Sequence, residues 1–275
     1  MRRRYLVVDQ NVYRLPEIAT IIANEPNTRF VIPDIALLEM TKSDEWERTL
    51  RQSLVQLAAV PHRTVIAHSV NYALSQELVG LKSFVGLMIY RQAMPHLHEI
   101  FEWIRTGKTT DTIHKIRSDI QGHRSDMASQ FLNHVENKSS AYELITATKS
   151  FLPPDLQKRL RQDQSDLSAR IEATYRIATS LLVDILVDRG FSRNRAIMYL
   201  RKRPVVYRYL VVRAWYCLRW LSLGGFEALK DYKLTNELLD QQYVVTASLF
   251  QGILSKEPAL NEAYAVLISI LKKEV

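Results

Sequence analysis

The chain has 275 residues, of which 47% are hydrophobic and 24% are charged, as is typical of a globular protein and not of a disordered or fibrous one. Only one cysteine, Cys217, is present, which excludes an intramolecular disulfide and a multi-cysteine metal site. Lys and Arg (37) exceed Asp and Glu (29) to give a net charge of +8, and this excess indicates a polyanionic partner such as nucleic acid. Neither common Gly-rich phosphate loop occurs, which argues against a P-loop or Rossmann nucleotide site.

The N-terminal third of the sequence alternates short β-branched runs with helical patterns. Strands separated by helices predict βαβ units and a mostly parallel sheet with helices on both faces, an α/β fold. In chain order, we expect a strand at Tyr5–Val8, a helix at Pro16–Ala23, a strand at Arg29–Ile32, a helix from an N-cap at Asp34 to about Ala59, and a strand at Arg63–Ala67.

The middle of the sequence is helical in pattern. Its interruptions are Pro95, Pro153-Pro154, Gly190 and Gly224-Gly225, and its polar part, Thr109–Ser150, is typical of exposed helices or an arm. The most apolar stretch, Tyr209–Phe226, is broken by arginines and does not predict a membrane span.

Near the C-terminus the α/β character returns. We expect a helix at Asn236–Phe250, a short strand at Gly252–Leu254 and a helix at Asn261–Lys273. Because closing a long loop costs little more than closing a short one, both chain ends can join one sheet. The sequence therefore predicts a discontinuous α/β domain of residues 1–70 and 225–275, with residues 71–224 as an all-helical insertion.

Acidic residues stand where such a sheet would bring them together. Asp9 ends the first strand and is followed by Asn11, Glu39 lies on the helix after the second strand, and Asp240 lies on the helix before the last strand. Sites in open α/β sheets form beyond the carboxyl ends of the strands. Carboxylates gathered there repel one another and need a cation, and oxygen ligands favour Mg²⁺ or Mn²⁺. Such an ion can activate water for attack on a phosphodiester.

Four segments resemble, in order, the motifs of PIN-domain nucleases. The similarity lies in a hydrophobic run before Asp-x-Asn, a Glu after leucines on a helix, an acid on a later helix, and a strand before Ser-x-acid. It covers at most half of the chain, and the last motif has Glu257 where Asp is more common. The segments are Val7–Val12, Ile32–Met40, Asn236–Asp240 and Leu254–Glu257.

The resemblance implies a PIN-like fold and a metal-dependent ribonuclease that hydrolyses RNA phosphodiester bonds. On it, Asp9, Glu39 and Asp240 would be catalytic metal ligands, with Glu257 or Glu237 supplementary. Asn11 and Ser255 would orient the carboxylates or the attacking water.

A basic segment, Arg189–Arg219, interleaves arginines with aromatic residues. Guanidinium groups bind phosphates and aromatic faces stack on unpaired bases, although the same pattern is also expected of core aromatics beside a solvated helix face. The residues expected to contact phosphate are Arg193, Arg195, Arg201, Lys202, Arg203 and Arg208.

Two alternatives stay open. Arg91 and His96 have the Arg-x4-His spacing of the metal-independent HEPN ribonucleases, although Pro95 lies within it. The scaffold could also be a catalytically inactive module that binds nucleic acid or protein, with Asp9 a turn residue and Glu39 and Asp240 surface charges.

The expected partner is RNA and the expected location cytoplasmic, without membrane association. An inhibitor or complex partner protein and a homo-oligomer stay open, as does the choice among RNA processing, toxin and defence.

Overall fold

The computed structural model describes residues 3–119, 143, 146, 148, 150–162, 167–222 and 231–273. The arm expected at Thr109–Ser150 lies mostly outside these residues, and so does the helix stop expected at Gly224-Gly225.

A parallel four-stranded sheet organises the fold. The strands lie in the order β3-β2-β1-β4, and each neighbouring pair is parallel. Strands from both ends of the sequence therefore share one sheet, which confirms the α/β class. The strands are β1 (Arg4–Val8), β2 (Thr28–Ile32), β3 (Thr64–Ile66) and β4 (Ile253–Leu254).

The C-terminal three residues of β1 and of β2 are apolar and buried because helices cover the sheet. Val7, Val8, Phe30, Val31 and Ile32 are fully buried. Consecutive residues of a strand point to opposite faces, so a run of buried residues means that both faces are covered. This is why the sequence shows continuous β-branched runs instead of alternation.

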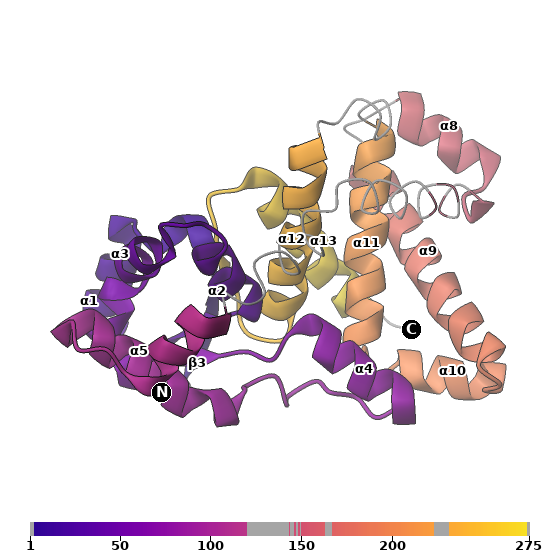
Figure 1. Cartoon of the computed structure of the whole chain (residues 1–275). Helices are drawn as coiled ribbons and strands as arrows, with labels where there is room; N and C mark the ends of the chain where they lie inside the picture. The colour runs from indigo at the N-terminus through magenta and orange to yellow at the C-terminus, as the bar shows by residue number, and fades with distance from the viewer. Residues whose placement is uncertain are drawn as a thin grey trace.

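Most of the described chain is helical. Figure 1 shows α1, α2, α3 and α5 on one side of the molecule and α8 to α11 on the other, with α12 and α13 between them. None of the described helices combines the length and apolar character needed to cross a lipid bilayer. The helices are α1 (Pro16–Asn24), α2 (Asp34–Thr41), α3 (Trp46–Ala58), α4 (Val70–Gly80), α5 (Met94–Thr106), α8 (Pro154–Gln162), α9 (Leu167–Asp188), α10 (Arg193–Leu200), α11 (Val205–Ser222), α12 (Asp231–Ser248) and α13 (Pro258–Lys272), and the short 3-10 helices are η1 (Gln10–Val12), η2 (Pro61–Arg63) and η3 (Arg91–Ala93).

One hydrophobic core joins the sheet to the helices of the middle segment. Val8 and Phe30 of the sheet belong to the same buried cluster as Phe101 of α5 and Trp215 and Trp220 of α11. The described part of residues 71–224 therefore shares its core with the sheet. A second, smaller cluster packs α8 and α9 against α11.

The single helix expected from Asp34 to about Ala59 is two helices, α2 and α3. Asp34 is the first residue of α2, and the N-cap position belongs to Pro33. The Thr41 hydroxyl donates back to the carbonyl oxygen of Leu37 at 2.8 Å, and the N–H of Trp46 donates to Ser43 at 3.1 Å. Side chains that hydrogen-bond to nearby backbone favour turns over helix, which explains the break.

Two buried charged residues connect elements through backbone groups. Arg63 is 6% exposed and donates to carbonyl oxygens of Ile22, Glu25 and Thr28 at 2.8, 2.6 and 3.0 Å. Glu77 of α4 is fully buried, and its two oxygens accept from the N–H groups of Phe84 and Val206 at 2.6 and 2.9 Å. Glu77 thereby satisfies an N–H in the first turn of α11.

Candidate functional site

Asp9 lies at the carboxyl end of β1 and is 3% exposed. One carboxylate oxygen accepts a hydrogen bond from the Ser255 hydroxyl at 2.6 Å, and the backbone N–H of Asn11 also donates to the carboxylate. Burial nevertheless raises the pKa of Asp9 above its ordinary value, and the nearby Glu257 adds to the rise. Ser255 follows β4, so the pairing of β1 with β4 positions this contact.

Glu39 of α2 faces helix α12. Its Oε2 accepts a hydrogen bond from the Tyr243 hydroxyl at 2.5 Å. Burial raises the pKa of Glu39, and the negative charge of Asp9 raises it further. The hydrogen bond from Tyr243 and the positive charge of Lys42 act in the opposite direction. Asp9 and Glu39 therefore lie close enough to repel each other.

Asp240 of α12 is the most strongly perturbed of these acids. Its pKa is raised to about 8, first by burial and then by repulsion from Asp9, Glu39, Glu257 and Glu237. Acids that follow β1 or lie on α2 and α12, up to 231 positions apart in the sequence, therefore interact electrostatically at the carboxyl end of β1. A carboxyl group with such a pKa is largely protonated at neutral pH unless a cation compensates for the repulsion.

Buried tyrosine hydroxyls surround these carboxylates. Within the described residues, the hydroxyls of Tyr13 and Tyr216 have no hydrogen-bond partner, although both side chains are fully buried. Burial and the charges of Asp9 and Glu39 raise the pKa of Tyr13 well above its ordinary value, and burial and Asp240 raise the pKa of Tyr216. Buried polar groups without a partner are rare in native proteins, so these two hydroxyls are available to a group or a water bound beside the acids.

The donor set fits a hard divalent cation such as Mg²⁺ or Mn²⁺, because carboxylate and hydroxyl oxygens are the ligands such ions prefer. One oxygen of Asp9 is held by Ser255 and one of Glu39 by Tyr243. In the part of the chain that the structure describes, no three Asp, Glu, His or Cys side chains are positioned to hold a metal together. Binding would therefore require these carboxylates to turn toward one another.

The supplementary acids differ from each other. Glu257 is exposed at the N-cap of α13 and faces Asp9 and Asp240 closely enough to raise the pKa of both. Glu237 is 5% exposed, and its oxygens accept from Arg219 at 2.7 Å and from the indole N–H of Trp220. Glu237 therefore joins α12 to α11 through both carboxylate oxygens, and of the two supplementary acids Glu257 is the one whose side chain is exposed beside Asp9 and Asp240.

The two residues expected to orient the acids act through different atoms. Ser255 uses its side-chain hydroxyl, which donates to Asp9. The side chain of Asn11 is exposed, and only its backbone N–H reaches Asp9.

The basic segment divides into buried and exposed parts. Arg208 is 9% exposed and donates to carbonyl oxygens of Arg203 at 3.0 Å and of Ser248. Arg203 donates to the carbonyl oxygen of Lys273. Arg208 is therefore a structural residue and not a phosphate ligand, which corrects the sequence-based expectation.

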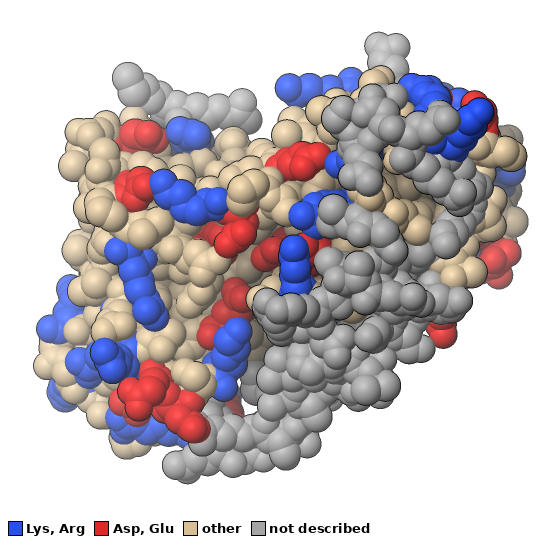
Figure 2. All heavy atoms as spheres, turned by 90° about the horizontal axis from the view of Figure 1, so that it is seen from above, with Lys and Arg blue, Asp and Glu red and all other residues tan. Residues whose placement is uncertain are grey.

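Arg193, Arg195, Arg201 and Lys202 are exposed on α10 and the turn after it. In Figure 1, α10 lies at the lower right, with α4 and α11 between it and α2. These four side chains are therefore remote from the acids. Figure 2 shows the surface from above, where carboxylates lie along a central hollow with Lys and Arg side chains on both sides.

Sequence reasoning missed the tyrosines around the acids. Tyr243 follows Asp240 by three positions on α12, so both lie on one face of the helix, and Tyr13 follows Asp9 by four positions. That spacing is the signal that could have identified them.

The Arg91 and His96 pair lies in two elements. Arg91 belongs to η3, and His96 lies in the first turn of α5, where its Nδ1 is 2.9 Å from the Thr112 hydroxyl. Pro95 stands at the start of α5, where a proline is tolerated, so the two residues do not share one continuous helix.

In comparisons with known proteins, the chain matches no family model, no curated protein and no solved structure. The resemblance to PIN-domain nucleases therefore depends on the residues of this chain alone.

Proposed function

We propose that the protein is a divalent-metal-dependent ribonuclease whose acidic site holds Mg²⁺ or Mn²⁺ and hydrolyses RNA phosphodiester bonds. The observation that carries the proposal is the position of Asp9 at the carboxyl end of β1, where Ser255 holds its carboxylate and where Glu39 and Asp240 lie near enough for their charges to interact with it. A cluster of partly buried carboxylates costs free energy without a cation, and a fold that serves only as a scaffold gains nothing from it.

Further support comes from the sheet and from the charge of the chain. The acids lie at the carboxyl ends of parallel strands, where α/β proteins form their sites. The net charge of +8 favours a polyanionic substrate. The choice of RNA comes from the PIN-like order of the sequence motifs.

In this proposal Asp9, Glu39 and Asp240 hold the cation and Glu257 assists from the rim. When bound, the cation neutralises charge on the phosphodiester and lowers the pKa of water. Ser255 keeps one oxygen of Asp9 in place, and Tyr243 does the same for Glu39. The buried hydroxyls of Tyr13 and Tyr216, which have no partner among the described residues, would donate to a water beside the acids.

The test is cleavage of varied single-stranded RNAs by purified protein with Mn²⁺ and with a chelator. We expect metal-dependent cleavage that Asp9→Asn, Glu39→Gln and Asp240→Asn each abolish. Asp184→Asn on α9 and Glu102→Gln on α5 are matched controls, because both side chains are exposed acids outside the site, and both variants should cleave normally. If the wild type leaves every RNA intact, the proposal fails.

The second candidate is a binding module without catalysis. It is favoured by the absence, among the described side chains, of three acids already arranged around one metal position. A module of this kind would bind RNA with strong salt dependence, and Asp9→Asn would change neither affinity nor its salt slope.

A further inference from the structure

A cavity of about 660 Å³ opens at the carboxyl ends of β2 and β3. It is lined by residues that follow β2 and β3, including Asp34 and His68, by α5, and by four residues between 112 and 119. Because β2 lies between β1 and β3, the residues that follow β2 and β3 stand one and two strands away from Asp9 along this edge of the sheet. Helix α2 contributes to both hollows, with Asp34 and Leu37 to the cavity and Glu39 to the acids.

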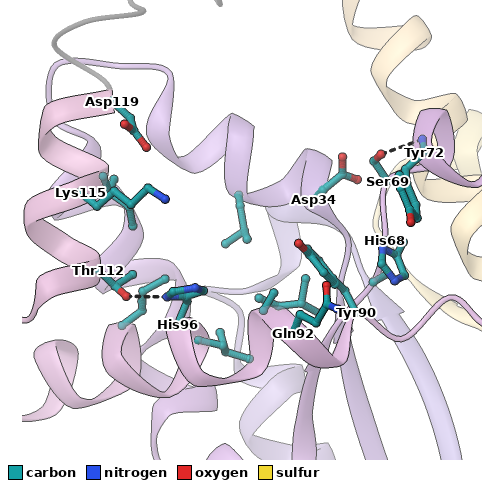
Figure 3. A pocket seen from close by; sticks show the side chains of 17 residues that line it. Asp34, His68, Ser69, Tyr72, Tyr90, Gln92, His96, Thr112, Lys115 and Asp119 are labelled. Carbon is teal, nitrogen blue, oxygen red and sulfur yellow. Dashed lines mark hydrogen bonds between the residues drawn. The ribbon is translucent and has the colours of Figure 1, made fainter.

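One wall of the cavity is a stack of aromatic rings. His68 lies between Tyr72 and Tyr90, with ring centroids 4.9 and 4.3 Å away and interplanar angles of 19° and 26°. Tyr90 is 36% exposed although its ring packs on His68. Figure 3 shows Tyr90 projecting into the open space, on the cavity side of His68. An aromatic ring packed on one side only offers its other face for stacking.

Polar groups converge on this space from both walls. Figure 3 shows Asp34 on the side of Tyr90, and His96, Thr112 and Lys115 on the opposite side. Burial raises the pKa of Asp34 to about 6 against hydrogen bonds from the backbone, and no charged group among the described residues contributes to the shift. The carboxylate is therefore ionised above neutral pH and keeps acceptor capacity toward the cavity.

We infer that this cavity binds an unpaired guanine base of the RNA, stacked on Tyr90 and held through its Watson–Crick edge by Asp34. This inference rests on the proposed function. An ionised carboxylate only accepts hydrogen bonds, and guanine alone among the four bases presents two adjacent donors, the ring N1–H and the exocyclic N2–H, to its two oxygens. Single-stranded RNA is read in this way, by stacking and by hydrogen bonds to the base edge. The cavity volume suits a nucleotide-sized ligand.

A second carboxylate, Asp119, lines the opposite wall of the cavity beside Lys115, whereas Asp34 is the carboxylate on the side of Tyr90. The imidazole of His96 is engaged with the Thr112 hydroxyl at 2.9 Å, and burial lowers the pKa of His68, so the ring stack is neutral. Lys115 lines the wall opposite Tyr90 and supplies a positive charge for the guanine O6 or a phosphate. The cavity thus offers an acceptor for the donor edge of guanine and a donor for its acceptor side.

The test is calorimetric titration of the full chain, in chelator, with the mononucleotides GMP, IMP, AMP, CMP and UMP. We expect GMP to bind about tenfold or more tightly than the others. IMP, which keeps N1–H and lacks the N2 amino group, should fall between GMP and the rest. Asp34→Asn should remove the preference, Tyr90→Ala should weaken all five, and Tyr90→Phe should restore binding. Circular dichroism verifies the fold of each variant.

Asp184→Asn, at an exposed acid outside both the cavity and the acidic site, is the control and should bind GMP as the wild type does. Equal binding of the five nucleotides, or a preference for GMP that survives Asp34→Asn, overturns the inference. Metal-dependent cleavage without this preference leaves the proposed nuclease standing and rejects the guanine cavity. A preference for GMP without any RNA cleavage supports the guanine cavity and rejects the proposed nuclease.

Discussion

Replacing Asp240 by Asn tests the convergence of the acids through stability alone. Asn keeps the size and shape of the side chain and removes its charge. The carboxyl group of Asp240 has a pKa of about 8 in the folded protein and an ordinary value of 3.8. Because the folded-state pKa is raised, folding takes up a proton between these two pH values. The contribution of Asp240 to the stability of the wild type is therefore fully present below about pH 4 and is lost as the pH rises through about 8.

The size of the effect follows from the same shift. Each pH unit between the two pKa values lowers the free energy of unfolding by up to about 1.4 kcal/mol. The free energy of unfolding therefore falls by at most about 4 kcal/mol from about pH 5 to pH 8. Asp240 keeps partial exposure, and solvent screens its interactions, so we expect about half of that value, ~2 kcal/mol. In a chain of this length, such a difference moves the melting temperature by roughly 4 to 8 °C.

Thermal denaturation in chelator at about pH 5 and pH 8 measures this difference. Asp240→Asn should melt near the wild type at the lower pH and clearly above it at the higher pH. The exposed acid Asp184 provides the control, and Asp184→Asn should follow the wild type at both pH values. Adding Mn²⁺ at the higher pH should stabilise the wild type more than Asp240→Asn. The reasoning is refuted if the melting temperatures of Asp240→Asn and the wild type differ by the same amount at both pH values, or if the variant melts below the wild type at pH 8.

Three further changes test the contacts around the site and the fold. Tyr243→Phe removes the hydrogen bond to Glu39, which raises the Glu39 pKa further. It should cost about 1 to 3 kcal/mol of unfolding free energy at pH 8 and less at pH 5, where the carboxyl is more protonated, as measured by urea denaturation. Arg63→Met leaves three backbone carbonyls without their donor and should cost about 2 to 4 kcal/mol in the same assay, whereas Arg193→Met, at an exposed position, should stay within about 0.5 kcal/mol. Glu77→Ala leaves the N–H groups of Phe84 and Val206 unpaired and should cost about 2 to 4 kcal/mol, and Glu77→Gln, which keeps an acceptor, should cost less.

The sheet could be predicted from the sequence because its signal is local. Continuous β-branched runs such as Tyr5–Val8 and Arg29–Ile32 are typical of strands buried on both faces, and the structure has β1 and β2 there. The break between α2 and α3 was missed because it depends on the hydrogen bonds that the hydroxyl of Thr41 and the turn at Ser43 form with the backbone, which the hydrophobic pattern does not report. Boundaries of this kind are set by single contacts.

The acids could be placed near one another because strand ends of a parallel sheet share an edge. What each charged residue does there depends on neighbours far away in sequence. Glu237 and Asp240 are three residues apart on α12, yet the first is held by Arg219 and Trp220 and the second faces the site. Arg208 has the same sequence context as exposed arginines and is buried against Ser248, a residue forty positions away. Sequence spacing predicts which residues share a face of a helix, but it does not predict which distant residues pack against that face.

The most direct test of the central claim is a titration of the full chain with Mn²⁺ at about pH 8, in which electron paramagnetic resonance measures the free ion. If Asp9, Glu39 and Asp240 together hold a cation, the wild type and Asp184→Asn should deplete the free Mn²⁺ signal. Asp9→Asn, Glu39→Gln and Asp240→Asn should each weaken that binding by about tenfold or more, as the loss of a metal-site residue does. Equal Mn²⁺ binding by the wild type and all three variants would contradict a shared site.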